Sequence, residues 1–366
     1  MTSANGSKAP LRILVTGAGA PGVRGTVFAL RNNPDDRPVH IIGTDITNDA
    51  VGRYFVDEFM AVDPPEHPDY IPRLKNLCAK LRIDFVLPQT TREIERLSTL
   101  HENDPEFAAR IAVSSGGTLA RVNNKAALYE AASGGQLPLP QFRIATTKDA
   151  LIRAAKDLGY PGQPVAVKPP LSNGMRGFRI LKENHWNKKR FFQEKPSGEH
   201  VRLEELVAML DDGSAWPELL VSEYLPGIEI TMDAFCGRDC RVALTRHRNK
   251  IRSGISFDNS FVHMPELEER VLEFSEQAGL RYAFGFQFKQ DAHGEYRLLE
   301  CNPRIQGTMV ASCFAGVNVI WMAVRELMGD PVSSHPPIDY GARFLRYWGG
   351  IGVVDGADGR PIATDI

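Results

Sequence analysis

The chain has 366 residues, enough for two or three domains, and its 43% hydrophobic and 24% charged residues are ordinary for a soluble globular protein. A formal net charge of -2 without a long basic run argues against a general nucleic-acid or anionic-membrane surface. No apolar stretch reaches the ~20 residues of a membrane span, the first ten residues do not resemble a signal peptide, and the five cysteines form no C-x-x-C pair. We therefore expect a cytoplasmic protein that binds neither nucleic acid nor membrane.

The N-terminal region alternates short apolar runs with helical patterns, which is typical of a parallel sheet wrapped by helices. Leucine and isoleucine recur at spacings of three and four between residues 71 and 81, which predicts an amphipathic helix. The expected strands are Leu11–Val15, Val39–Gly43, Phe85–Leu87 and Ile111–Val113.

The order of elements changes beyond about Pro140. The clearest helix there runs from Pro265 to Ala278, because proline stands at its start and Gly279 at its end. Other helices are expected at residues 149–158, 203–210 and 317–328. The expected strands are 165–168, 178–181, 219–225, 229–235, 242–246 and 344–348, with a hairpin over 284–302.

A glycine-rich turn follows the first expected strand. Gly17, Gly19 and Gly22 fit G-x-G-x-x-G, and Asp45 ends the next strand, as in dinucleotide-binding proteins. However, Pro21 falls in the tight turn, and no hydride-transfer constellation follows it. We favour a strand-to-helix turn that needs glycine for its backbone geometry, and keep an NAD(P)-dependent oxidoreductase as the alternative from a different class.

The strongest local signal is the hairpin that carries Gln287 and the run Glu300-Cys-Asn302-Pro-Arg304. Side chains alternate faces along a strand, so Glu300 and Asn302 point the same way. A two-residue turn at His293-Gly294 places Gln287 directly opposite Glu300, whereas a three-residue turn shifts the pairing by one position. Oxygen ligands suit Mg²⁺, which is usually held by one or two carboxylates plus substrate phosphates. We therefore favour a metal site over a polar surface hairpin, with Arg304 able to approach a transferring phosphoryl group.

A second signal is Lys168, which ends the apolar strand Val165–Lys168. A lysine in such a strand is uncommon unless its ammonium meets a partner, although it can also snorkel from a strand end. The turn that follows, Ser172-Asn173-Gly174-Met175-Arg176-Gly177, can cover phosphates with backbone N–H groups.

A third signal is the Pro-Gly bend in Glu223-Tyr224-Leu225-Pro-Gly-Ile-Glu229, which joins two expected strands. Such a hinge exposes backbone groups to an adenine edge, and Glu229 can accept hydrogen bonds from ribose hydroxyls. By itself this pattern is common.

Together and in this order, the three signals resemble the ATP-grasp superfamily. In that family an early lysine and a second strand lysine hold ATP phosphates, the E-Y-L-P-G-x-E stretch holds adenine and ribose, and the E-x-N-P-R strand holds Mg²⁺. Lys125 stands where the early lysine is expected. The resemblance implies that one or two Mg²⁺ ions bind Gln287, Glu300 and Asn302, and glutamine at position 287 looks like the carbamoyl-phosphate-synthase branch. It implies ATP contacts by Lys125, Lys168, Ser172, Asn173, Gly174, Arg176, Gly177, Glu223, Tyr224, Leu225 and Glu229.

The resemblance also implies the fold and its division. The fold class is α/β: a Rossmann-like preceding domain over residues 1–118, then a two-lobed α+β ATP-grasp fold. Residues 119–222 are expected to form the linker helix and small lobe, and residues 223–366 the large lobe with the metal site and the C-terminal tail.

The implied activity is that of an ATP-dependent ligase that phosphorylates a carboxylate and joins the acyl phosphate to an amine, with Arg304 and Lys168 catalytic. A basic run lies between the hinge and the metal strands, where similar proteins line the acceptor side, so Arg246 or Arg252 is expected to hold the substrate carboxylate. A solvated strand edge is the alternative for Arg248 and Lys250. The expected partners are therefore a small-molecule carboxylate and an amine, with a homodimer as a family-level expectation.

Other activities remain open. The length excludes a complete carbamoyl phosphate synthase, which needs two such modules. Carboxylate phosphorylation of the carbamoyl-phosphate-synthase or kinase type is the enzymatic alternative, and an ATP-binding module without turnover is another class.

Overall fold

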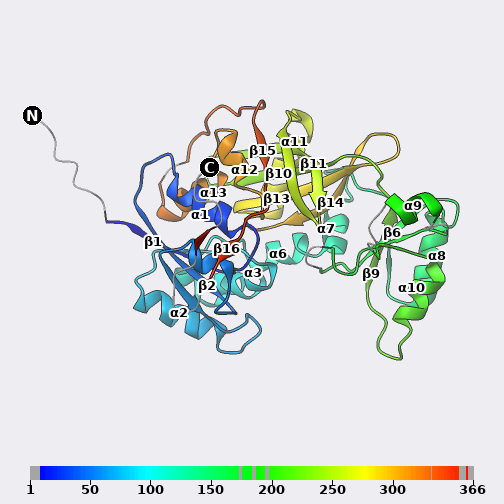
Figure 1. Ribbon diagram of the computed structural model, residues 1–366, viewed down its shortest axis with the longest axis horizontal. Coiled ribbons are helices and arrows are strands. Elements are labelled where there is room, and N and C mark those ends of the chain that lie inside the picture. The colour runs from blue at the N-terminus through cyan, green and yellow to red at the C-terminus, as the bar shows by residue number, and fades with distance from the viewer. Residues whose placement is uncertain are drawn as a thin grey trace, which may run out of the picture. The chain divides into compact units, whose positions relative to one another are not determined.

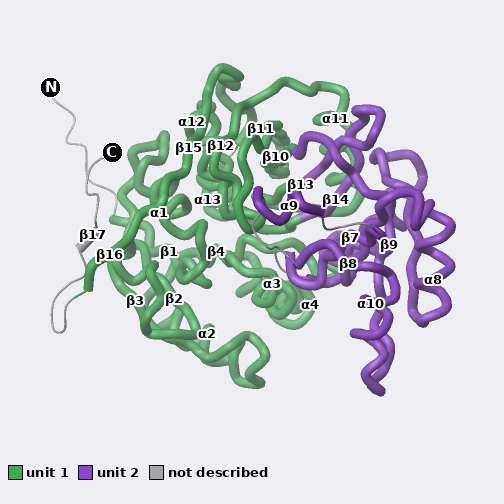
Figure 2. The backbone as a smooth tube through the Cα atoms, turned by 45° about the vertical axis from the view of Figure 1, so that its right-hand side comes forward, with its two compact units in different colours: residues 1–120, 230–286, 302–366 green, residues 121–229, 287–301 purple. Residues whose placement is uncertain are grey.

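The computed structural model describes residues 9–172, 175–183, 187–193, 198–330, 332–353 and 360–361. The chain divides into two compact units (Figure 2). Unit 1 comprises residues 1–120, 230–286 and 302–366, and unit 2 comprises residues 121–229 and 287–301. The division into three parts at residues 118 and 222 stays a prediction, since the two units divide the chain at other points.

A parallel four-stranded sheet of order β3-β2-β1-β4 forms the N-terminal part of unit 1, and Figure 1 labels its strands β1 and β2. The central strand β1 buries Ile13, Leu14 and Val15 completely, as expected when both faces of a parallel sheet are covered. The strand predicted at 111–113 is reduced to one bridge between Ile111 and Val86, so that prediction is wrong. The elements are β1 (Leu11–Val15), α1 (Val23–Arg31), β2 (Val39–Asp45), the 3₁₀ helix η1 (Val51–Tyr54), β3 (Glu58–Ala61), α2 (Tyr70–Lys80), β4 (Phe85–Leu87), α3 (Thr91–Ser98), α4 (Leu100–Asn103), α5 (Pro105–Ala108) and α6 (Gly116–Val122).

A six-stranded sheet has the order β14-β13-β10-β11-β12-β15, and three borders between the units fall within its strands β10, β13 and β14. β11 and β12 are joined at Ser253-Gly254, whose φ angles of 48° and 77° are those of a type I′ hairpin turn. The helix predicted from Pro265 to Ala278 is confirmed to the residue, and Gly279 ends it in the left-handed conformation. The elements are β10 (Glu229–Cys236), β11 (Arg241–Arg252), β12 (Ile255–Phe261), α11 (Pro265–Ala278), β13 (Tyr282–Gln290), β14 (Tyr296–Asn302), α12 (Ala311–Phe314), α13 (Val319–Met328), β15 (Arg343–Leu345), β16 (Ile351–Gly352) and β17 (Arg360–Pro361).

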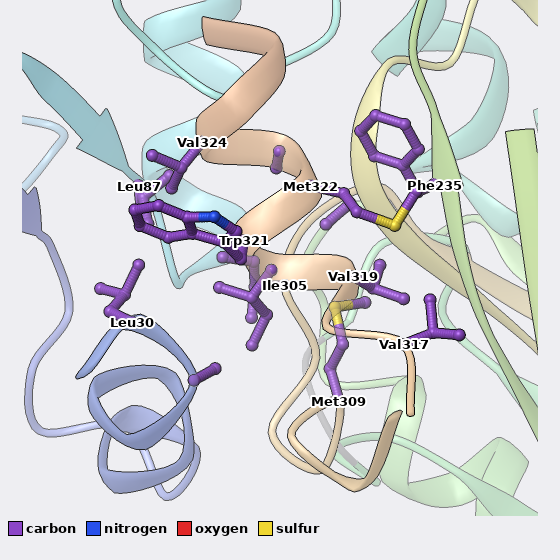
Figure 3. Packing of buried hydrophobic residues seen from close by; sticks show 14 of the residues in the cluster. Leu30, Leu87, Phe235, Ile305, Met309, Val317, Val319, Trp321, Met322 and Val324 are labelled. Carbon is purple, nitrogen blue, oxygen red and sulfur yellow. The ribbon is translucent and has the colours of Figure 1, made fainter. Parts of the chain in front are cut away.

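One hydrophobic core joins the N-terminal sheet of unit 1 to its C-terminal helix α13. Trp321 of α13 lies in the same buried cluster as Leu30 of α1 and Leu87 of β4 (Figure 3). The indole Nε1 donates a 2.6 Å hydrogen bond to Asp35, so the polar tip of this large side chain is satisfied. The N-terminal sheet therefore shares a hydrophobic core with α13.

Unit 2 is built on a five-stranded sheet of order β5-β9-β6-β7-β8, antiparallel except for the pair β7-β8. All four residues of β6 are buried, because it pairs with β9 on one side and β7 on the other. Helices α8 and α10 add Leu151 and Leu206 to the core of this unit. The elements are α7 (Lys125–Ala132), β5 (Phe142–Ala145), α8 (Lys148–Asp157), β6 (Val165–Lys168), β7 (Arg179–Leu181), α9 (Lys188–Gln193), β8 (His200–Val201), α10 (Leu203–Leu210) and β9 (Leu219–Glu223).

Across the residues that the structure describes, no helix combines the length and apolar character needed to cross a membrane.

Candidate active site

Two lysines and one carboxylate meet in unit 2. Lys125 begins α7, and its Nζ lies 3.1 Å from Glu300 Oε2 and donates a 3.4 Å hydrogen bond to the carbonyl oxygen of Ser172. Lys168 ends β6 and donates a 3.1 Å hydrogen bond to the carbonyl oxygen of Leu299. The fold thus gathers three residues that the sequence places far apart.

The charge balance of this cluster favours an anion. Lys168 is 9% exposed, and burial lowers the pKa of its ammonium to about 8, with repulsion by Lys125 acting in the same direction. Glu300 and Glu229 raise that pKa and so oppose the shift. Two buried ammonium groups close to each other repel, and a bound phosphate chain relieves that repulsion. The donor set therefore fits the phosphates of a nucleotide.

The segment that follows β6 contains a glycine with a required backbone conformation. Gly177 has a φ of 77°, and a Cβ there would lie 2.6 Å from the ring of Pro169, so only glycine fits. Arg176 precedes it as an exposed residue of the turn. The backbone N–H of Lys125 donates to the carbonyl oxygen of Pro170 at 3.0 Å, which holds the start of α7 to this turn. The predicted phosphate contacts Asn173 and Gly174 lie outside the described residues.

The Pro-Gly hinge is held by the end of β13. The N–H of Gly227 donates to the carbonyl oxygen of Gln290 at 3.0 Å, and the N–H of Ile228 donates to its Oε1 at 3.3 Å. A Cβ on Gly227 would lie 2.6 Å from the Cβ of Gln290, so glycine permits this close approach. The hinge backbone is thereby fixed on its C-terminal side.

The N-terminal side of the hinge leaves two backbone donors for a base. The N–H of Glu223 donates to Gln141 O at 3.0 Å, and Glu223 Oε1 accepts from Gln141 N at 2.9 Å. Within the described part of the chain, the N–H groups of Tyr224 and Leu225 have no such backbone partner. These two groups fit an adenine edge, whereas Oε1 of Glu223 already accepts a hydrogen bond from Gln141 N.

The hairpin turn between β13 and β14 has three residues. Asp291 N donates to Glu295 O at 2.9 Å, so three residues form the loop, which is the second of the two turns that the sequence left open. The Asp291 side chain accepts from the N–H groups of His293 at 2.8 Å and Glu295 at 3.0 Å, and Gly294 has a φ of 86°, the features of a turn closed by a bulge.

The longer loop shifts the pairing next to it by one residue, so the turn does not set Gln287 opposite Glu300. Burial along β14 also fails to alternate strictly, since Leu298 and Cys301 are buried while Leu299 and Glu300 are both half-buried. Strand alternation alone therefore does not describe how Glu300 is placed, and its ion pair with Lys125 is the contact that locates its carboxylate.

Arg246 in unit 1 is committed to an internal ion pair. It is 1% exposed, its Nε lies 2.8 Å from Asp233 Oδ2, and its Nη1 donates a 2.5 Å hydrogen bond to Asn259 Oδ1. Asp233 is fully buried and also accepts from Gln306 Nε2 at 3.4 Å. Because Arg246 already faces a carboxylate, its predicted role toward the substrate stays a prediction.

The other basic residues of β11 have different surroundings. Arg252 ends the strand as an exposed residue, with its guanidinium 5.3 Å from the ring centroid of Phe257. Arg248 is buried and donates to Ser256 Oγ at 2.6 Å and Gly254 O at 2.5 Å, so the solvated-edge alternative is wrong for it. Lys250 is exposed, as that alternative predicts.

Arg304 follows β14 and is held within unit 1. Its Nε donates to Thr91 Oγ1 at 3.2 Å and its Nη1 to the carbonyl oxygen of Ile305 at 3.0 Å. Its Nη2 lies 3.5 Å from Asn302 Oδ1, a weak contact that orients the amide. Among the described residues, no group of three or more His, Cys, Asp and Glu side chains is placed to hold a metal ion.

The glycine-rich turn packs against protein backbone. A Cβ on Gly22 would lie 2.5 Å from the Cα of Gly307, and Gly19 N donates to Asp45 Oδ2 at 2.7 Å. The glycine needed at position 22 and the acid at the end of β2 thus both have structural explanations. This supports the interpretation of a turn that needs glycine for geometry.

Arg346 was not identified from the sequence, which predicts only a strand at residues 344–348. Its Nη2 donates to Gly307 O at 2.8 Å and its Nη1 to Pro21 O at 3.3 Å. Burial lowers the pKa of the guanidinium, with Arg246 contributing in the same direction, and Nε is buried without a partner in the described part of the chain. Tyr129 was missed as well, although it lies one helical turn after Lys125, a spacing that signals a shared face.

Two family models match the chain. Residues 215–347 match the family described as "ATP-grasp in the biosynthetic pathway with Ter operon", and residues 13–113 match "PylC-like, N-terminal domain".

Solved structures cover nearly the whole chain. N5-carboxyaminoimidazole synthetase from Staphylococcus aureus, complexed with ADP, has a TM-score of 0.66 at 15% identity and covers 93% of this chain and 81% of its own. The biotin carboxylase domain of 2-oxoglutarate carboxylase from Hydrogenobacter thermophilus, complexed with MgADP, ADP and bicarbonate, has a TM-score of 0.69 at 17% identity and covers 96% and 83%. Biotin carboxylase from Campylobacter jejuni has a TM-score of 0.67 at 15% identity and covers 91% and 74%.

These likenesses show the fold, and they agree with the family model that matches residues 215–347. The predicted α/β class, with a parallel N-terminal sheet before an ATP-grasp fold, is confirmed. The chain therefore has an ATP-grasp fold, with an ATP-grasp family match over residues 215–347 and a PylC-like N-terminal match over residues 13–113.

Proposed function

We propose that this protein is an ATP-dependent ligase that phosphorylates a carboxylate and joins the resulting acyl phosphate to an amine. The observation that carries the proposal is the cluster of Lys125 and Lys168 beside Glu300 in unit 2. Two buried cations with one metal-type carboxylate suit a magnesium-bound triphosphate. The solved neighbours that contain ADP and MgADP support the choice of nucleotide and ion.

Different residues of unit 2 bind the phosphates, the base and the ribose of the nucleotide. Lys125 and Lys168 bind the phosphates, with Ser172, Arg176 and Gly177 as further contacts, and the sequence assigns the same role to Asn173 and Gly174. Tyr224 and Leu225 contact the base through backbone N–H groups. Glu223 holds the hinge, and Glu229 accepts hydrogen bonds from the ribose hydroxyls.

The metal set agrees with hard-ion chemistry. Glu300 provides the carboxylate, and Gln287 and Asn302 provide neutral oxygens, for one or two Mg²⁺ ions. When bound, Mg²⁺ neutralises charge on the phosphates. The ion pair between Lys125 and Glu300 holds this carboxylate in place in the absence of the metal.

The reaction has two steps in which atoms balance. A carboxylate oxygen of the substrate attacks the γ-phosphorus, the bond to the β–γ bridging oxygen breaks, and ADP leaves. The amine nitrogen then attacks the acyl carbon, phosphate leaves, and the amine releases a proton to solvent. Lys168 and Arg304 stabilise the negative charge that develops on the transferring phosphoryl group, and Arg304 also serves the later oxyanion.

Arg252 is the better candidate of the two predicted arginines for the substrate carboxylate, because it is exposed while Arg246 is paired with Asp233. Arg252→Ala is expected to raise the KM for the carboxylate substrate by on the order of tenfold or more, since a charge-assisted hydrogen bond is lost. The KM for ATP stays unchanged. Steady-state kinetics on both substrates measure this, with Lys250→Ala, an exposed residue of the same strand, as the matched control. An unchanged carboxylate KM removes Arg252 from the site.

The test of the function itself is ADP release from Mg-ATP with pooled carboxylates and amines, with mass spectrometry of the products and Glu300→Ala as the control. ADP release that needs both partners, gives a condensed product and vanishes in the control supports a ligase. Release with a carboxylate alone supports the kinase-type alternative. If no member of the panel causes ADP release, and NAD(P) rather than ATP raises the melting temperature, the proposal is contradicted.

We also expect the enzyme to act as a homodimer; the solved biotin carboxylase domain from Hydrogenobacter thermophilus is a dimer. Sedimentation of the purified protein measures this directly.

A further inference from the structure

Tyr129 contacts Lys168 of the proposed phosphate site, although nothing in the ATP-grasp motifs points to it. It is on the same face of α7 as Lys125, four residues later in the helix. The residue is completely buried, and its ring packs edge-on against Phe142 of β5 at 5.2 Å between centroids. The ring therefore has a fixed place in the core of unit 2.

The Tyr129 hydroxyl binds the backbone next to the proposed metal ligand. It donates a 2.6 Å hydrogen bond to the carbonyl oxygen of Leu298, and the carbonyl oxygen of Leu299 lies 3.3 Å away. These two residues immediately precede Glu300 on β14. Burial raises the pKa of the phenol, so the hydroxyl keeps its proton and remains a donor.

Lys168 approaches the same tyrosine from β6. Its Nζ lies 5.5 Å from the centre of the Tyr129 ring and donates a long, 3.5 Å hydrogen bond to the hydroxyl oxygen. The same Nζ donates to Leu299 O at 3.1 Å. Within the described part of unit 2, the ammonium is thus directed by a ring face, a hydroxyl and a carbonyl, and no carboxylate forms an ion pair with it.

We infer that Tyr129 is a positioning residue that holds the Lys168 ammonium against β14, so that Lys168 meets the nucleotide phosphates at a fixed distance from Glu300. This rests on the proposed function, because it takes Lys168 as a phosphate ligand. The tyrosine joins three elements at once: α7 that carries Lys125, β6 that carries Lys168 and β14 that carries Glu300. A phenylalanine keeps the ring and removes only the hydroxyl, so it isolates the contribution of that group.

The experiment measures equilibrium binding of ATP and of adenosine to wild-type protein and to Tyr129→Phe. We expect ATP to bind about tenfold more weakly to the variant, because the hydrogen bonds that place Lys168 are lost, while adenosine binds equally to both. In the Lys168→Met background, we expect Tyr129→Phe to cause no further loss of ATP affinity. A general structural effect of Tyr129→Phe would instead lower the affinity in both backgrounds.

Tyr160→Phe is the matched control, since this buried tyrosine of unit 2 uses its hydroxyl on Glu183 and the N–H of Leu203 instead. Equal ATP affinity in Tyr129→Phe and wild type overturns the inference, as does an additive loss in the Lys168→Met background. If Tyr129→Phe does not fold, folding of the Tyr129→Phe/Lys168→Met double variant supports the link to Lys168, and its failure to fold overturns it. Absence of ATP binding by the wild type contradicts the proposed function instead.

Discussion

Lys168→Met is expected to lower kcat/KM for ATP-dependent ADP release by on the order of 10² to 10³, while the folded protein becomes more stable. The activity falls because methionine cannot neutralise the charge that develops during phosphoryl transfer. Stability rises because burial and the neighbouring Lys125 disfavour the ammonium in the folded chain. A gain in stability together with a loss of activity marks a residue retained for function.

The pH dependence of this gain has a defined sign. Folding lowers the pKa of Lys168 from 10.5 to about 8, so the unfolded chain binds the proton more tightly than the folded chain does. The penalty is present in full below about pH 8 and declines as pH rises toward 10.5. The advantage of Lys168→Met over wild type in the free energy of unfolding should therefore be largest at neutral pH and shrink in alkaline buffer.

Urea unfolding at several pH values measures the stability, and ADP release measures the activity. Lys156→Met is the control, because Lys156 is an exposed lysine of α8 in the same unit and its loss should change neither quantity appreciably. Full activity in Lys168→Met would show that this lysine is not a phosphate ligand. Lower stability at neutral pH would show that its charge is well compensated in the fold.

Asp233→Ala is expected to lower the free energy of unfolding by about 3–5 kcal/mol, because it leaves Arg246 buried without a compensating charge. The pair is shielded on all sides: the side chains of Arg246 and Asp233 are 2% and 0% exposed, with 2.8 Å between Nε and Oδ2. The substitution also removes the acceptor of Gln306 Nε2. Equilibrium urea unfolding followed by circular dichroism measures the loss.

Replacing both partners distinguishes this cause from a simple cavity. The double variant Asp233→Leu/Arg246→Met removes the isolated charge and is expected to recover most of the lost stability. Asp63→Ala is the control, since it removes one partner of an ion pair whose side chains are 32% and 57% exposed, and only a small change is expected. If the double variant is as unstable as Asp233→Ala, the buried charge is not the cause.

Much of the fold was predictable because local patterns decide it. β6 and α10 match the predicted ranges to the residue, since an apolar run and a periodic stripe with clear ends specify them. The strand at 111–113 failed because one bridge to Val86 is all that the sheet edge provides there. Edge pairing depends on tertiary contacts that a short apolar run does not encode.

The candidate site was predictable in its residue types but not in its detailed contacts. Lys125, Lys168 and Glu300 were identified from motif order, and the fold brings them together. The register of the metal hairpin was not predictable from His293-Gly294. The Asp291 side chain accepts hydrogen bonds from the N–H groups of His293 and Glu295 and so stabilises a three-residue loop.

The internal ion pair of Arg246 also could not be predicted from the sequence. Its partner Asp233 comes from the neighbouring strand, and nothing in the basic run indicates which arginine faces inward.

The split of unit 2 into residues 121–229 and 287–301 has a consequence for biosynthesis. A ribosome adds about 5–20 residues per second, and N-terminal domains commonly fold first during synthesis. Here Lys125 and Lys168 are made well before the hairpin whose carbonyl oxygens and carboxylate accept their hydrogen bonds. Unit 2 therefore completes only after the intervening residues 230–286 have left the ribosome, and a chain stopped before residue 287 holds two lysines directed at an absent strand.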